Sequence, residues 1–259
     1  MTRRLRKVLA LLGPAGIAAL CLQGAADAAT AAEVRSGPGS LSGVWTNADY
    51  PRNAGFQPRE HIRKTVDGKM PPLQPWAAAL LEQRVKGSEA GKVFASPKSQ
   101  CLPAGMPAMM FPAGSPLQIL ENPGQVTILV EEPNFFRIIP LNQKHEDDPD
   151  PSYLGDSVGH WEGDTLVVDT IAVTDKVPID PAGMPHTDAM HVVERFRRTS
   201  NEVLEVLITI DDPKTFTAPW NAVTHFRLQP NRRVTQYFCE NNRDLSDTHQ
   251  QIGFGPLGK

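Results

Sequence analysis

The chain has 259 residues, of which 40% are hydrophobic and 21% charged, and its formal net charge is −3. This length suits one large domain or two small ones. Because no basic stripe runs along the sequence, its charge argues against nucleic acids and anionic membrane surfaces as partners.

The first 32 residues have the pattern of a secretory signal peptide. Basic residues within 3–7 precede an apolar run over 8–22, and small residues follow at 25–29. The run is too short, and too often interrupted by Gly and Pro, to span a bilayer. We therefore expect residues 1–32 to be removed on export, which makes the protein periplasmic or secreted. No later run is long enough to cross a membrane, so no integral membrane segment is expected in the mature chain.

Two cysteines, Cys101 and Cys239, would remain after export. In an oxidising compartment two distant cysteines most simply form a disulfide, which would close a loop of about 138 residues. Chain-entropy models give such a bridge about 4–5 kcal/mol. A catalytic thiol and a thiolate metal ligand are the alternatives, but no CxxC or Cys/His spacing supports either.

Residues 33–116 are rich in Pro and Gly and are predicted to form a covering segment. A short first strand is expected at 41–45. The stretch 75–86 predicts a single helix, with Pro75 at its first position and Gly87 at its end. The helix face expected to dock on the main body holds Trp76, Leu80 and Leu81.

From residue 117 onward, short β-branched and aromatic runs alternate with turn signals. This pattern predicts an all-β fold, an antiparallel up-and-down meander that closes into a barrel because closure removes exposed edges. A β-sandwich is the alternative. The barrel over 117–259 and the covering segment would form one structural domain, 33–259. The expected strands are 117–121, 125–132, 135–141, 157–161, 165–173, 190–198, 203–211, 222–229 and 233–240.

The clearest hairpin signal is SVGHWEGDTLVVDT at 157–170. Its turn contains Gly163, which can adopt a positive φ. Two long insertions, 142–156 and 174–189, would lie at the barrel mouths. For the acidic run 145–151 in the first insertion, a solvated loop is favoured over a cation site.

Motifs elsewhere accompany this WEGDTLVVDT hairpin: LSGVW at 41–45, CLPAGMP at 101–107, and PHxxxxH-V-x-ERF at 185–196. As a set they resemble a largely uncharacterised family of secreted bacterial β-rich proteins, and the resemblance covers nearly all of the mature chain. It implies no catalytic residues. The Gly-x-Trp entry at 43–45, followed by a meander, is also similar to the calycin (lipocalin-like) barrels.

The candidate catalytic residues lie where the second insertion enters a strand: His186, Asp188, His191 and Glu194. At a barrel rim they could perform acid–base chemistry, with His191 or Arg195 as an orienting cation. Apolar neighbours on the strand would raise the pKa of Glu194 toward neutrality. Alternation along a regular strand places His191 on the face opposite Glu194.

Two alternatives stay open for this cluster. His186, His191 and a carboxylate could form a metal site, although their spacing matches no standard zinc signature. Otherwise Glu194 and Arg195 make cross-strand ion pairs and the histidines are ordinary loop residues. No metal and no cofactor are our expectation.

A second set of residues, candidates for ligand binding, comprises Arg137, His160, Trp161, Asp169, Arg195 and His225. Four members of this set lie on separate strands, and any of them could project inward: Arg137, His160, Asp169 and His225. A buried Arg needs a carboxylate partner or an anionic ligand, and structural ion pairing is the more common outcome.

No Gly-x-Ser-x-Gly elbow, phosphate loop, dinucleotide fingerprint or paired-Cys motif occurs in the sequence. Serine hydrolases, kinases and nicotinamide enzymes are therefore disfavoured. We expect a periplasmic or secreted β-barrel that binds a small apolar or aromatic molecule, with lyase- or isomerase-type acid–base chemistry as an option. The alternatives are a carrier without chemistry, a metal-dependent hydrolase and a structural accessory of the cell envelope.

Overall fold

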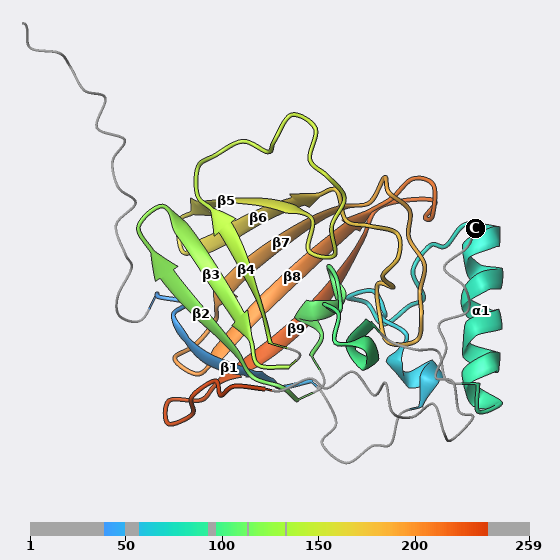
Figure 1. Ribbon diagram of the computed structural model, residues 1–259, viewed down its shortest axis with the longest axis horizontal. Helices are drawn as coiled ribbons and strands as arrows, with labels where there is room; N and C mark the ends of the chain where they lie inside the picture. Colours follow the sequence, from blue (N-terminus) through green and yellow to red (C-terminus); the bar gives the residue numbers. More distant parts are fainter. Residues whose placement is uncertain (1–38, 50–56, 93–96, 113, 133, 238–259) are drawn as a thin grey trace, which may run out of the picture. The chain divides into compact units, whose positions relative to one another are not determined.

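Nine antiparallel strands form the body of the protein in a computed structural model that describes residues 39–49, 57–92, 97–112, 114–132 and 134–237 (Figure 1). The strands are β1 (Gly43–Asn47), β2 (Leu117–Asn122), β3 (Gln125–Val130), β4 (Phe135–Pro140), β5 (Asp156–Glu162), β6 (Thr165–Ile171), β7 (His191–Arg198), β8 (Val203–Asp211) and β9 (Trp220–Leu228). The predicted all-β, up-and-down antiparallel fold is confirmed.

The strands form one sheet in the order β4-β3-β2-β1-β9-β8-β7-β6-β5. Apart from β1 and β9, each pair of neighbours is consecutive in sequence, so the sheet is a meander. Figure 1 shows β2, β3 and β4 facing β5 to β9 across the interior. The two end strands, β4 and β5, contact each other, and Leu141 forms a single bridge to Gly159. We call this junction the seam; apart from it, the barrel is closed.

Gly159 permits the close approach of the two strands at the seam. A Cβ at this position would lie 2.9 Å from Ile139 Cγ2 and 3.3 Å from Leu141 Cδ2, both shorter than ordinary contacts. The Asn142 N–H donates to the Gly159 carbonyl at 2.7 Å. A side chain at position 159 would therefore push β4 away from β5.

Alternation along the strands fills the interior with apolar side chains. β8 buries every second residue, and its inward face holds Leu204, Val206, Ile208 and Ile210. The largest fully buried side chains include Trp45, Phe196 and Phe226. Each buried side chain of this size contributes roughly 1.5–3 kcal/mol, so interior packing is the main source of the barrel's stability.

The N-terminal segment contributes a strand to the barrel as well as covering it. β1 pairs with β2 through Val44 and Gln118, and with β9 through Thr46 and Arg227. The barrel is therefore not confined to 117–259. All described residues belong to one compact unit.

Helix α1 (Pro75–Glu89) begins at Pro75, as predicted, but it continues through Gly87. Its buried face holds Ala77, Leu81 and Val85, spaced four residues apart. The predicted docking face was partly wrong, because Trp76 is 45% exposed. The Trp76 indole still donates to the Lys214 carbonyl at 2.9 Å.

The covering stretch 97–112 contains the short 3-10 helices Pro97–Gln100 and Ala108–Met110; a third one, Pro58–His61, lies earlier in the chain. Four side chains of the covering stretch are buried in the hydrophobic core: Met106, Met109, Met110 and Phe111. A Cβ at Gly105 would overlap the Val177 side chain, so the covering stretch packs tightly on the second insertion.

One predicted strand, 233–240, is wrong over 233–237, and 238–240 lie outside the described residues. The reason is topological: β9 already pairs with β8 on one side and β1 on the other, which leaves no free edge. The predicted signal peptide and Cys239 also lie outside the described residues. Export and the Cys101–Cys239 bridge therefore stay predictions.

Candidate functional site

Four polar side chains from four consecutive strands meet inside the barrel, and we call them the inner polar cluster: Arg137 on β4, Ser157 on β5, Thr170 on β6 and Glu194 on β7. None is more than 5% exposed. They face inward because alternate residues of a strand point to opposite sides, and each of the four occupies a position on the buried side. Ser157 lies directly opposite Thr170 in the β5–β6 register. Since β4 and β5 flank the seam, Arg137 crosses it on the inner side.

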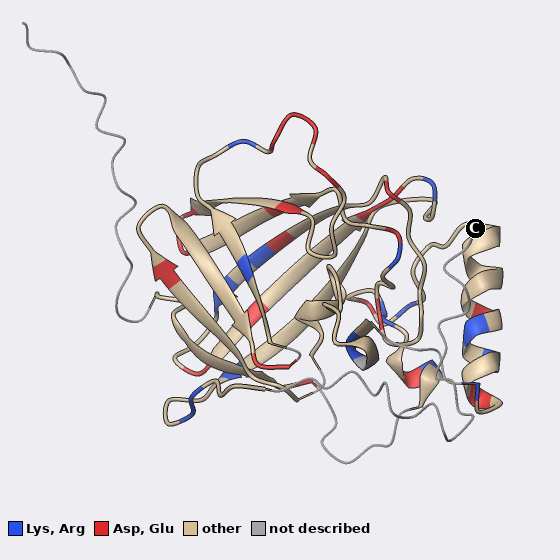
Figure 2. Cartoon of the chain, viewed as in Figure 1, with Lys and Arg blue, Asp and Glu red and all other residues tan. Residues whose placement is uncertain are grey.

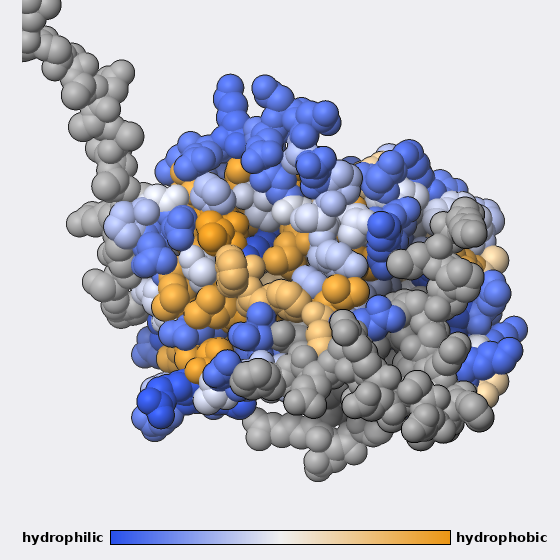
Figure 3. Space-filling model, viewed as in Figure 1, coloured by the Kyte–Doolittle hydropathy of each residue, from blue (hydrophilic) through white to orange (hydrophobic). Residues whose placement is uncertain are grey.

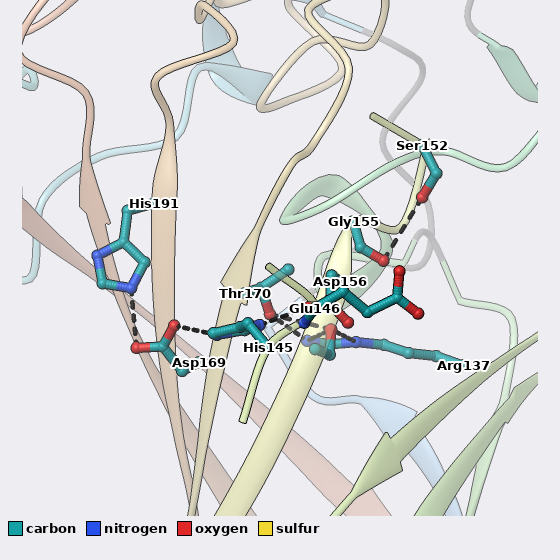
Figure 4. Close-up of polar contacts among 10 residues, drawn as sticks. Arg137, His145, Glu146, Ser152, Gly155, Asp156, Asp169, Thr170 and His191 are labelled. Atoms are coloured by element: carbon teal, nitrogen blue, oxygen red, sulfur yellow. Dashed lines mark hydrogen bonds and ion pairs between the residues drawn. The ribbon is translucent and has the colours of Figure 1, made fainter. Parts of the chain in front are cut away.

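The Arg137 guanidinium connects the four side chains. Its Nε and Nη2 donate to Ser157 Oγ at 3.1 and 3.0 Å, and Nη2 donates to Thr170 Oγ1 at 2.7 Å (Figure 4). Nη2 also lies 2.6 Å from Glu194 Oε2, which makes a buried ion pair. Nη2 already donates to both hydroxyls, and neither Glu194 oxygen has a hydrogen-bond partner among the described residues, so the contact with Glu194 is an ion pair without an aligned hydrogen bond.

Several atoms of the inner polar cluster have no hydrogen-bond partner among the described residues. They are Nη1 of Arg137 and both carboxylate oxygens of Glu194. Leaving a buried polar group unpaired costs about 1–3 kcal/mol, and more for a charged group. Buried polar groups in folded proteins are almost always paired with protein, ordered water or a ligand. The cluster therefore has the capacity to bind one more polar group.

A second group of side chains, the outer network, lies on the outer face: His145, Asp156, Asp169 and His191. His145 Nδ1 lies 2.7 Å from Asp156, and its Nε2 lies 2.8 Å from one oxygen of Asp169. His191 Nε2 lies 2.8 Å from the other Asp169 oxygen, so Asp169 lies between the two rings (Figure 4).

Both ring nitrogens of His145 face carboxylates, which accept but do not donate, so the ring is a doubly protonated imidazolium. Burial lowers the pKa of His145, but the hydrogen bonds with Asp169 and Asp156 outweigh it and hold that pKa above its ordinary value. The His145 ring holds the first insertion, whose acidic residues are shown in Figure 2, against β5 and β6.

His186 is buried, 5% exposed, in the second insertion. Its Nδ1 lies 2.9 Å from the Thr187 carbonyl, and its Nε2 has no hydrogen-bond partner in the described part of the chain. Burial lowers the pKa of His186 by more than the Thr187 carbonyl and Asp212 raise it. The imidazole is therefore neutral at pH 7.

Asp188 lies on the surface, where its Oδ1 is 2.8 Å from Lys214 Nζ. The nearby Asp212, which was not a candidate, has the more extensive contacts. It accepts hydrogen bonds from the Thr187 N–H at 2.7 Å and the Thr215 hydroxyl at 2.7 Å. Burial would raise the pKa of Asp212, but the hydrogen bonds from Thr215 and Thr187 outweigh it and lower that pKa. Asp212 therefore connects the end of the second insertion to the β8–β9 connection.

Among the remaining ligand-binding candidates, His160, Arg195 and His225 lie on the outside of the barrel, whereas Trp161 shares the inward parity of Ser157 on β5. His160 and Arg195 both pair with Glu162, at 3.2 and 2.5 Å. His225 lies 3.2 Å from Asp49. Trp161 is partly buried and packs against the hydrophobic core. Among the four residues expected to be able to project inward, only Arg137 does so.

The structure does not bring the four candidate catalytic residues together. Glu194 lies inside the barrel, whereas His191 lies on the outer face, as the alternation predicted. Asp188 is exposed, and His186 is buried in the insertion. Glu194 instead pairs with Arg137, which belongs to the ligand-binding set.

Sequence reasoning missed Ser157, Thr170, His145 and Asp156. The hairpin register was the available signal for the first two, because it places both hydroxyls on one face of β5 and β6. His145 lay in the acidic run interpreted as a solvated loop, and only the folded structure shows that its ring is held by Asp156 and Asp169.

Among the described residues, no group of three or more His, Cys, Asp or Glu side chains is arranged to hold a metal ion. No helix in the same part of the chain is both long and apolar enough to span a membrane. No protein-family model matches the sequence, and a search of curated proteins finds no significant match. The family resemblance drawn from the motifs stays a prediction.

Proposed function

We propose that this protein binds a small, partly apolar molecule inside its barrel, with the inner polar cluster as the anchor for the ligand's polar group. The observation that carries the proposal is the set of buried polar atoms on Arg137 and Glu194 that have no hydrogen-bond partner among the described residues, although the two side chains form an ion pair. A half-satisfied buried ion pair is less stable than apolar packing of the same volume. A ligand that supplies the missing hydrogen bonds would explain why this ion pair is present in an apolar interior.

A small apolar pocket lies beside the start of β4. The turn after β3, the covering stretch and the first insertion enclose an apolar pocket whose lining includes Val130, Phe135 and Leu154. Figure 3 shows hydrophobic side chains gathered around a hollow on this face. The enclosed free volume is only about 10 Å³, the space of one water, so entry requires widening. Because the seam has a single backbone bridge, a ligand would enter the barrel there in this proposal.

We infer binding without turnover. Among the described residues, the ionisable partner that Glu194 contacts is Arg137, which stays protonated and cannot exchange a proton. General acid–base catalysis needs a second proton-active group within reach of the same substrate. The carrier without chemistry therefore fits the geometry better than a lyase or isomerase.

A second candidate function, a structural accessory of the cell envelope, is favoured by a different observation. Large side chains such as Trp45, Phe196 and Phe226 occupy the barrel interior. If these side chains leave no room for a ligand, the barrel has a structural role. Arg137 then serves to hold β4 against β5 and β6 across the seam.

Native mass spectrometry of protein purified from an exporting cell tests the proposal. Wild type should carry a small molecule that is released on denaturation. A double variant, Arg137→Met with Glu194→Leu, keeps the interior volume and should fold, yet carry none. A wild-type protein with no bound molecule, whose melting temperature is unchanged by a small-molecule extract of the source cells, would favour the structural role.

A further inference from the structure

We infer that the inner polar cluster selects an uncharged ligand group that both accepts and donates hydrogen bonds, such as an alcohol or a carboxamide. This inference rests on the proposed function, because it specifies the ligand of the same site. It follows from counting donors, acceptors and charges on the four side chains.

The donor side of the cluster is Nη1 of Arg137. This nitrogen carries two hydrogens and has no acceptor among the described residues. The other guanidinium nitrogens already donate to Ser157 and Thr170. A ligand must therefore supply an acceptor atom to Arg137.

The acceptor side is the Glu194 carboxylate, which is fully buried. Neither of its oxygens receives a hydrogen bond from the described residues. Because an ionised carboxylate can only accept, the ligand must also supply a hydrogen. The Ser157 and Thr170 hydroxyls lie 3.1 Å apart, so one of them donates to the other. The second hydroxyl keeps its own hydrogen, but neither hydroxyl donates to Glu194 in the described part of the chain.

The charge of the site decides between neutral and ionic ligands. The two ions are 2.6 Å apart, so the site as a whole is close to neutral. An added anion would be repelled by Glu194, and an added cation by Arg137. Either ion would also lose its hydration in an interior with low dielectric constant. An uncharged group with both a donor and an acceptor meets neither penalty.

A matched series of octyl compounds tests this selectivity on the wild-type protein: 1-octanol, octanamide, octanoate and octylammonium. All four have the same apolar chain and differ in the charge and hydrogen bonding of the end group. Isothermal titration calorimetry at neutral pH should give 1-octanol and octanamide an affinity at least about tenfold above that of the two ions.

Glu194→Gln provides the matched variant, since it keeps the side-chain shape and removes the negative charge. Arg137 then lacks its counter-ion, so octanoate should gain affinity relative to 1-octanol. A thermal melt confirms that the variant is folded. If it is not, the double variant Arg137→Met with Glu194→Leu replaces it, and the difference in affinity between 1-octanol and the apolar probe octane should disappear.

The outcomes separate the inference from the proposed function. Octanoate or octylammonium binding to wild type as tightly as 1-octanol would overturn the inference and leave the proposed function standing. A cluster that holds only ordered water, which also donates and accepts, would bind none of the four probes. That result rejects the inference, and the co-purification experiment then decides the proposed function.

Discussion

Arg137 and Glu194 are charged side chains with 2% and 0% exposure that lie 2.6 Å apart. Removing two charges from water costs several kcal/mol per ion, and good geometry is needed to offset it. Here Nε and Nη2 of the guanidinium donate to Ser157 and Thr170, and Glu194 has no aligned hydrogen bond among the described residues. At this scale the pair is better explained as part of a binding site than as a source of stability.

Glu194→Gln should lower the free energy of unfolding by about 3–5 kcal/mol, because it leaves Arg137 buried and charged without a counter-ion. Glu162→Gln is the matched control: it also removes an ion pair, with Arg195, but on the exposed outer face where water screens the charges. Its melting temperature should stay close to that of wild type. Chemical denaturation at neutral pH compares the variants. Equal stability of Glu194→Gln and wild type would show that Arg137 needs no carboxylate partner.

Part of this residue-level arrangement was predictable from the sequence. A buried Arg was expected to need a carboxylate, and strand alternation correctly separated Glu194 from His191. Ser157 and Thr170 were not identified, because hydroxyl residues are common in strands. Only the pairing of β5 with β6, and the return of β4 to β5, shows that both face Arg137.

The first insertion is an element whose position depends on His145. The ring contacts Asp156 on β5 and Asp169 on β6, and Asp169 also contacts His191 on β7. The backbone N–H of Glu146 adds a hydrogen bond to Asp156 at 3.1 Å. These contacts hold the insertion beside the seam, so its stability should depend on pH.

Because the pKa of His145 is raised in the folded protein, the folded state binds this proton more tightly than the unfolded state. The resulting stability is fully present below the unfolded pKa of about 6.5, and it is lost as the pH rises through the folded pKa. Wild type should therefore exceed His145→Gln in stability by more at about pH 5.5 than at about pH 9.

Denaturation curves of both proteins at the two pH values measure this change. Using the difference between wild type and variant cancels the effect of His186, whose lowered pKa destabilises the fold as the pH falls below the unfolded value. A stability difference that does not change with pH would contradict the proposed role of His145.

The seam makes a second prediction at the scale of elements. Gly159→Ala places a methyl group 2.9 Å from Ile139 and should destabilise the protein by about 1–3 kcal/mol through overpacking. Gly87→Ala is the control, because nothing lies within 4 Å of a Cβ there and helix α1 should gain about 0.5–1 kcal/mol. Thermal melts of the two variants should shift in opposite directions. An unchanged melt for Gly159→Ala would mean that β4 and β5 are not tightly apposed.

Most strands were predicted because alternation and turn residues are local signals. The false strand at 233–240 has the same local signals, and it fails because pairing is decided by distant residues. β1, about 180 residues earlier in the chain, occupies the edge that a further strand would need. The docking face of α1 was also misjudged, since Ala77 and Val85 carry weaker hydrophobic signals than Trp76.

At the scale of the whole molecule, β1 closes the barrel by joining β2 to β9. The covering stretch and the second insertion then pack on each other through Gly105 and Val177. The sequence predicted closure in general terms, but the strand order around β1 depends on tertiary pairing that no local pattern reports.

The predicted bridge between Cys101 and Cys239 is a property of the whole chain, because it would link the covering stretch to the C-terminal region. Peptide mapping by mass spectrometry of exported protein, without reductant, should recover the two cysteine-containing peptides as one linked species. Reduction should lower the free energy of unfolding by about 2–5 kcal/mol. Two thiols that alkylate freely in the folded, exported protein would disprove the bridge.

The central claim is that the inner polar cluster is completed by a ligand. A crystal structure of the exported protein grown with 1-octanol tests it most directly. We predict that the hydroxyl lies within hydrogen-bond distance of both Arg137 Nη1 and a Glu194 oxygen, with the alkyl chain running toward β4. Ordered water alone at the cluster, or side chains repacked so that Arg137 and Glu194 satisfy each other, would contradict the claim.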